Sequence, residues 1–189
     1  MPIPFREADG VDDLGVAGFL KIDLCAVGST YVGALLLINA RGEPVEFTYS
    51  RVEVPHVALW RPSDARRFAV RKLVVSLLSM CPKVPHMLLC LVEDVERDLF
   101  SRYVQLSLPV CLVTRAAGGE APDAYEGSDP LPTAHATDLF WLPGLPAEDS
   151  SAVRLLQELT IRNFVIEPFS RASRGLREVY APVASVETK

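Results

Sequence analysis

The sequence predicts an α/β fold, in which one mixed β-sheet of about five strands is flanked by helices. Three segments with strand patterns follow one another near the N-terminus. A strongly periodic helix separates them from a short apolar strand, and helices and strands alternate from there to the C-terminus. The expected order is therefore a three-strand meander followed by helix, strand, helix, strand and helix. With 189 residues, the chain is long enough for one domain with its own core.

Three strands are expected before the first helix. Residues 18–25 alternate, so that Leu20, Ile22 and Leu24 face one side of the sheet. The other side receives Phe19, Lys21, Asp23 and Cys25. Residues 31–38 are almost all apolar, which predicts a central strand buried on both faces. Residues 45–54 alternate again, after a hairpin loop in which Gly42 supplies a positive φ.

A long helix is predicted over residues 63–80. Pro62 and Ser63 suit its N-terminus, and Pro82 ends it. Apolar residues recur every three or four positions along one face of this helix: Ala65, Phe68, Ala69, Leu73, Val74, Leu77 and Leu78. A short buried strand over 86–92 is expected next.

The second half of the chain is predicted to be less regular. Residues 94–106 suggest a helix or a helical turn, and 109–114 a strand. Further helices are expected from Asp149 onward and after Pro168. Together these elements form a single domain over residues 15–180. The segments expected to be irregular are an N-terminal arm (1–14), a long loop (115–148) that contains an apolar group at 140–142, and a frayed tail (181–189).

Composition excludes several classes of protein. Apolar residues make up 49% and charged residues 23%, which is typical of a globular domain and not of a disordered chain. No apolar run approaches the roughly 18 residues of a membrane helix, and the N-terminus lacks an export signal. Four cysteines without metal-binding or paired spacing are expected to be reduced core residues of a cytoplasmic protein: Cys25, Cys81, Cys90 and Cys111.

The distribution of charge indicates binding surfaces. The net charge is −5, but Lys and Arg outnumber acids in residues 61–83 and 151–189. The predicted binding residues lie on two helices: Arg66, Arg67, Arg71 and Lys72 on the first, and Arg171, Arg174 and Arg177 on the last. They form either solvated helix faces or a basic surface for phosphate or an acidic protein. A mean hydropathy of +0.21 favours another protein chain or a second copy as partner, with nucleic acid as the alternative and no membrane contact.

Sequence motifs give no support for a cofactor. The chain contains neither a phosphate-binding Gly-x-x-x-x-Gly-Lys loop nor a Gly-x-Gly-x-x-Gly fingerprint. It also lacks a Gly-x-Ser-x-Gly elbow. His56, His86 and His135 are far apart in the sequence, and none is spaced from a Cys or another His as zinc ligands are. We therefore expect no catalytic residue and no cofactor from motifs alone.

The order of the predicted elements resembles the ribonuclease H-like fold, and endonuclease V in particular, over residues 16–113. The resemblance implies a Mg²⁺-dependent nuclease, with Asp23 on the first strand and Glu93 or Asp94 after the fourth as catalytic and metal-binding carboxylates. The family pattern has a Phe-Arg-Glu string with a metal-binding glutamate at the start of the helix. This chain has Arg66-Arg67-Phe68 there instead. A further ligand would come from Asp138, His135 or Glu167.

The segment from Gly33 to Ser50 also resembles a hairpin of uncharacterised small bacterial α/β proteins, a likeness that implies no activity. The predicted function is that of a non-catalytic, cytoplasmic binding or assembly subunit of a prokaryotic multiprotein complex that handles nucleic acid. The alternative is a divergent metal-dependent nuclease with Asp23, Glu93 and Asp94 in its active site. A third interpretation is a small-molecule sensor with its pocket under the 115–148 loop.

Overall fold

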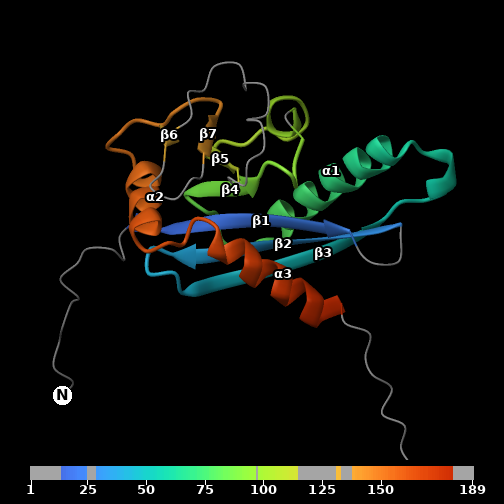
Figure 1. Ribbon diagram of the computed structural model, residues 1–189, viewed down its shortest axis with the longest axis horizontal. Helices are drawn as coiled ribbons and strands as arrows, with labels where there is room; N and C mark the ends of the chain where they lie inside the picture. Colours follow the sequence, from blue (N-terminus) through green and yellow to red (C-terminus); the bar gives the residue numbers. More distant parts are fainter. Residues whose placement is uncertain (1–13, 25–28, 97, 115–130, 133–137, 181–189) are drawn as a thin grey trace, which may run out of the picture.

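A computed structural model describes residues 14–24, 29–96, 98–114, 131–132 and 138–180 (Figure 1). In chain order the elements are β1 (Val16–Leu24), β2 (Thr30–Asn39), β3 (Pro44–Glu53), η2 (Val57–Leu59), α1 (Pro62–Met80), β4 (Met87–Leu91), η3 (Leu99–Tyr103), β5 (Val110–Val113), β6 (Leu131–Pro132), β7 (Asp138–Leu142), α2 (Ser151–Ile161) and α3 (Glu167–Tyr180). The predicted arm, apart from Leu14, and the predicted tail lie outside the described residues.

The strands form one mixed sheet in the order β3-β2-β1-β4-β5-β7-β6. Strands β1, β2 and β3 pair antiparallel, which confirms the predicted meander. Strand β4 then pairs parallel with both β1 and β5. Because β1 and β4 are parallel neighbours, with Leu20 opposite Cys90, their carboxyl ends lie at the same edge of the sheet.

Two details of the sheet differ from the prediction. It has seven strands instead of about five, because β7 pairs antiparallel with β5 and β6 with β7, although the sequence places both segments in a loop. Strand β2 is buried on both faces as expected, but β4 is the central strand. Residues 94–106 contain the π-helical turn η3 (Leu99–Tyr103), which is one of the two alternatives that the sequence predicts there.

The sheet lies between two helical layers (Figure 1). Helix α1 covers one face, where Leu73 and Leu77 lie over Gly33 of β2 and share one buried cluster with Leu20. Helices α2 and α3 cover the other face, and there the rings of Phe19 and Phe169 meet edge to face at 5.2 Å. Each fully buried large side chain of this kind contributes about 1.5–3 kcal/mol. No helix in the described part of the chain is long and apolar enough to cross a membrane.

Local sequence accounts for the main boundaries. Pro62 occupies the first turn of α1, where a missing N–H removes no helical hydrogen bond. The Ser150 hydroxyl accepts a hydrogen bond from the Val153 N–H and so caps α2. Gly42 has φ 80° in the β2–β3 turn, as predicted, and a Cβ there would also clash with the Phe164 ring.

Candidate functional site

The carboxyl edge of β1 and β4 brings together two of the predicted carboxylates. Asp23 is on β1, and Asp94 follows β4. The Lys21 ammonium lies between them: its Nζ is 3.1 Å from Asp23 Oδ1 and 2.8 Å from Asp94 Oδ1. Lys21 also donates to the second oxygen of Asp94 at 2.9 Å. The positive charge is therefore shared by both carboxylates.

Burial strengthens this ion cluster. The Asp94 side chain is 5% exposed and that of Lys21 11%, whereas Asp23 at 37% reaches water. Burial raises the pKa of Asp94 above its ordinary value, and the Lys21 ammonium and the Ile22 N–H offset part of that effect. Because a buried charge is costly unless it is paired, Asp94 and Lys21 depend on each other.

The other carboxylates proposed from the resemblance do not join the cluster. Glu93 is exposed, and its backbone carbonyl accepts a hydrogen bond from the Arg66 guanidinium. Asp138 is on β7, at the far side of β5 from β4, and Glu167 pairs with Arg171 on α3. His135 lies outside the described residues.

The donor set at Asp23 and Asp94 does not fit a divalent cation. Within the described residues, no group of three His, Cys, Asp or Glu side chains could hold a metal ion. A hard cation such as Mg²⁺ takes six oxygen ligands and is repelled by an ammonium. Here Lys21 already neutralises the two carboxylates that converge.

The basic residues of α1 are held in different ways. Arg67 pairs with Glu96 at 2.7 Å and approaches Asp64 at 3.9 Å, and the hydrogen bond that Arg67 donates to Glu96 raises the pKa of Arg67. The Arg71 guanidinium lies 3.9 Å from the centre of the Tyr103 ring, a cation–π contact. Lys72 is exposed, with its ammonium 6.0 Å from the Phe68 ring centre.

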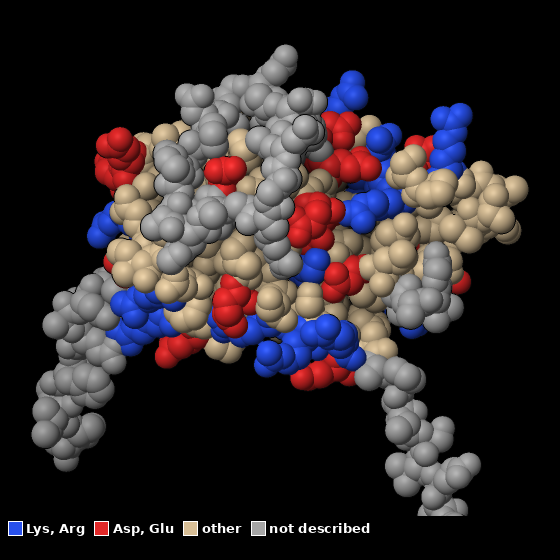
Figure 2. All heavy atoms as spheres, in the orientation of Figure 1, with Lys and Arg blue, Asp and Glu red and all other residues tan. Residues whose placement is uncertain are grey.

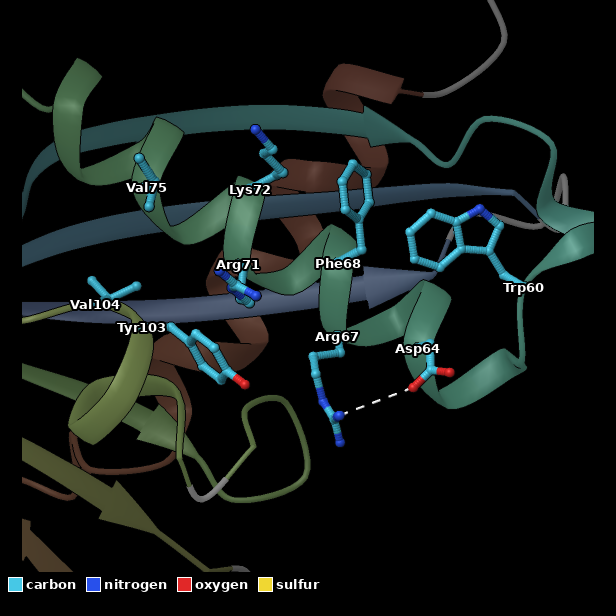
Figure 3. A pocket seen from close by; sticks show the side chains of 9 residues that line it. All are labelled: Trp60, Asp64, Arg67, Phe68, Arg71, Lys72, Val75, Tyr103 and Val104. Atoms are coloured by element: carbon cyan, nitrogen blue, oxygen red, sulfur yellow. Dashed lines mark ion pairs between the residues drawn. The ribbon is translucent and has the colours of Figure 1, made fainter.

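These residues line a groove on the outer side of α1 (Figure 3). Its volume is about 450 Å³, in the range of ligand-binding clefts. Nine residues from α1, from the segment before it and from η3 and its end form the walls: Trp60, Asp64, Arg67, Phe68, Arg71, Lys72, Val75, Tyr103 and Val104. We call this site the α1 groove. The sequence identifies its cations but not its shape.

The three arginines of α3 do not form one free ridge. Arg171 pairs with Glu167 at 2.7 Å and donates to the Gly42 carbonyl at 2.7 Å, so it ties α3 to the β2–β3 turn. Arg174 is exposed, and Arg177 lines a separate polar pocket with Asp23 and Tyr180. In Figure 2, Lys and Arg side chains gather over α1 and α3 among acidic ones, without a continuous basic track.

The buried thiols are unreactive in this environment. Burial raises the pKa of Cys90 and of Cys111, because an apolar surrounding disfavours the thiolate. Both are free cysteines, as is the partly buried Cys81. Cys25 lies outside the described residues. The expectation of reduced core thiols is thus confirmed for Cys90 and Cys111.

Comparison with solved structures identifies the fold. Endonuclease V from Streptomyces avermitilis has a TM-score of 0.55 at 18% identity, over 88% of this chain and 83% of that one. Endonuclease V from Bacillus subtilis gives 0.55 at 13% identity, over 89% and 83%. The fold is ribonuclease H-like. No family model and no curated protein matches the chain.

A segment of Argonaute from Marinitoga piezophila gives a TM-score of only 0.40 at 7% identity, over 81% of this chain and 26% of that one. The endonuclease V structures confirm the ribonuclease H-like fold predicted from the sequence, and in this chain β3, β2, β1, β4 and β5 are successive neighbours in the sheet. At identities below one fifth, the structural similarity establishes the fold alone. The chemistry of the site has to be inferred from the residues of this chain.

The sequence predicts only some of the residues that determine the chemistry of the ion cluster and of the α1 groove. The alternation of residues 18–25 puts Lys21 on the same side of its strand as Phe19 and Asp23, but it does not mark Lys21 as part of a site. A lysine at a core-facing strand position requires a buried counter-ion, and that requirement is the signal that could have identified it. Trp60 and Tyr103 carried no such signal, since the α1 groove exists only once α1 and η3 are packed together.

Proposed function

We propose that this chain is a non-catalytic, cytoplasmic binding subunit of a prokaryotic multiprotein complex. The observation that carries the proposal is the Lys21 ammonium, which lies within 3.1 Å of Asp23 and of Asp94. In a metal-dependent phosphoryl transfer, a cation would have to sit between carboxylates of this kind and neutralise the developing charge. The chain's own lysine supplies the neutralising charge instead.

The start of α1 supports the same conclusion. Where the endonuclease V pattern has a metal-binding glutamate, this chain has arginines, and Arg66 hydrogen-bonds the backbone just before Asp94. The Arg66 guanidinium thus lies against the residue before Asp94, and its positive charge there disfavours a further cation. The fold would then serve as a scaffold for binding, and the apolar side chains exposed on α1 and before it would contact a partner.

A cleavage assay tests the proposal against the nuclease alternative. Labelled single- and double-stranded DNA and RNA are incubated with the full chain in Mg²⁺ or Mn²⁺, alongside Asp23→Ala and the surface control Asp149→Ala. We expect no cleavage that depends on Asp23. Cleavage by the wild type and by Asp149→Ala that is lost in Asp23→Ala would overturn the proposal and establish the nuclease.

The role as a subunit needs a separate test. Sedimentation of the purified chain and co-purification from its native host at moderate salt should show a stable complex with another protein or with a second copy. A stable interface of this kind buries at least about 1,000 Å² in total. A monomer that recovers no partner under both conditions would contradict the subunit role.

A further inference from the structure

We infer that the α1 groove binds a short segment of a partner protein that combines apolar side chains with one or two carboxylates. The inference rests on the proposed binding function and names the surface and the chemistry of the partner. It follows from the groove's apolar walls and from its two cations without a described carboxylate partner.

The walls of the α1 groove are mostly apolar. Trp60 and Phe68 lie with ring centres 5.2 Å apart, and Val75 and Tyr103 complete the lining further along the helix (Figure 3). Trp60 is 36% exposed, Val75 51% and Tyr103 37%, although α1 already buries a different stripe of residues against the sheet. Helix α1 therefore carries exposed apolar surface, on Val75 and on part of Phe68, outside the stripe that the sheet covers.

The Trp60 side of the groove is held in place. The Trp60 indole N–H donates to the Pro55 carbonyl at 3.1 Å, which fixes the ring beside Phe68. Leu59 and Val57, in the turn before Trp60, are 86% and 40% exposed. An apolar side chain of a partner would meet a preformed surface here and lose little additional conformational freedom in the protein.

Two cations remain for the ligand. Arg67 is offset by Glu96 and Asp64, but neither Arg71 nor Lys72 forms an ion pair with a carboxylate in the part of the chain that the structure describes. The Tyr103 ring orients the Arg71 guanidinium beside the apolar walls. Arginine in such a position can bind a carboxylate with two parallel hydrogen bonds.

The same charges favour an acidic peptide over nucleic acid. A nucleic-acid strand needs a series of unpaired cations to follow its phosphates. Among the described residues the α1 groove offers two, Arg71 and Lys72, because Glu96 and Asp64 offset Arg67. A peptide with one or two carboxylates matches the two cations, and its apolar side chains match Trp60, Phe68 and Val75.

Selection of displayed random peptides on the full chain tests this inference. Enriched peptides are synthesised with a fluorophore, and their dissociation constants are measured by anisotropy for the wild type, Phe68→Ala and Arg71→Glu. Two matched controls change the same chemistry on α2: Ile161→Ala removes an exposed apolar side chain, and Arg154→Glu reverses an exposed charge. Fluorescent oligothymidylate is titrated in parallel, and thermal melts confirm that each variant is folded.

We expect enriched peptides to contain apolar residues with Asp or Glu, and either groove variant to weaken binding about tenfold or more while the controls leave it unchanged. Failure to enrich any peptide, or equal binding by the groove variants, would overturn the inference. Oligothymidylate binding that Arg71→Glu abolishes would assign the groove to nucleic acid instead. None of these outcomes depends on Asp23, so the cleavage assay still decides the proposed function separately.

Discussion

The cluster at the carboxyl edge of β1 and β4 and the α1 groove use charge in opposite ways. In the cluster, Lys21 faces Asp23 and Asp94 at hydrogen-bond distance, and Asp94 is almost fully buried. In the groove, Arg71 and Lys72 are exposed and lie against aromatic rings. Charges of the first kind neutralise one another inside the protein, whereas those of the second kind remain available to a ligand.

This difference shows that a shared fold does not by itself determine what the chain does. The ribonuclease H-like sheet brings Asp23 and Asp94 together, as the resemblance implied, but one lysine on the same strand converts the pair into an internal ion cluster. Interaction with other molecules then depends on surfaces away from that edge. Stability measurements distinguish the two regions, because internal charges contribute to folding and exposed ones do not.

The largest effect is expected at Lys21. Lys21→Met leaves Asp94 buried without its counter-ion and should lower the free energy of unfolding by about 3–5 kcal/mol, measured by urea denaturation. Lys21→Met combined with Asp94→Leu removes both buried charges and should restore most of the loss. Equal destabilisation by the single and the double variant would show that the pair does not act as a unit.

Substitutions on the buried and the exposed side of α1 should change the free energy of unfolding by very different amounts. Leu73 is fully buried against the sheet, so Leu73→Ala should lower the free energy of unfolding by about 2–5 kcal/mol. Val75 is half-exposed in the α1 groove, and Val75→Ala should change it by less than about 0.5 kcal/mol. A thermal melt monitored by circular dichroism checks both variants. Comparable losses would mean that both faces of α1 are buried.

The sequence predicts those features of the two regions that depend on residues close together along the chain. Local patterns located α1 by Pro62 and its apolar stripe, and the β2–β3 turn by Gly42. The sequence does not predict β7, because a segment of five residues among prolines and acids has too little periodicity to indicate a strand. Its strand conformation depends on pairing with β5. Phe68 belongs to the predicted core stripe and does pack against that core, but the sequence does not show that its ring also lies beside Trp60 in the α1 groove.

The cluster depends on contacts that are distant in sequence. Lys21 and Asp94 are 73 positions apart, and their contact requires the parallel pairing of β1 with β4. The sequence named Asp23 and Asp94 through a resemblance of topology, and it treated the arginines of α1 and α3 as equivalent. Only packing shows that Arg171 is used internally while Arg174 is exposed.

A smaller effect separates these two arginines of α3. Arg171 hydrogen-bonds the Gly42 carbonyl and pairs with Glu167, so Arg171→Ala should lower the free energy of unfolding by about 1–2 kcal/mol. Arg174→Ala, its matched control one helical turn away, should leave it within about 0.5 kcal/mol of the wild type. Guanidinium denaturation monitored by tryptophan fluorescence measures both. If Arg171→Ala left the free energy of unfolding unchanged, the contacts of Arg171 with Gly42 and Glu167 would not hold α3 in place, and Arg171 would be a solvated surface residue.

The smallest effect concerns pH. The pKa of Asp94 is raised above its ordinary value of 3.8, so its carboxyl group stabilises the folded state most when protonated. This contribution is present below about 3.8 and is lost as the pH rises through the raised pKa. The free energy of unfolding of the wild type minus that of Asp94→Asn should therefore fall between acidic and neutral pH. A difference that increases with pH would indicate a lowered pKa.

The most direct test of the Lys21 cluster is an NMR titration of the full chain with Mn²⁺, whose unpaired electrons broaden the signals of nearby nuclei. With the ammonium between the carboxylates, the amide signals of Ile22, Asp23 and Asp94 should weaken no more than those of Glu148 and Asp149, exposed acids that report non-specific binding. Selective loss of the Ile22, Asp23 and Asp94 signals, reversed by a chelator, would place a divalent cation at this edge and contradict the role of Lys21.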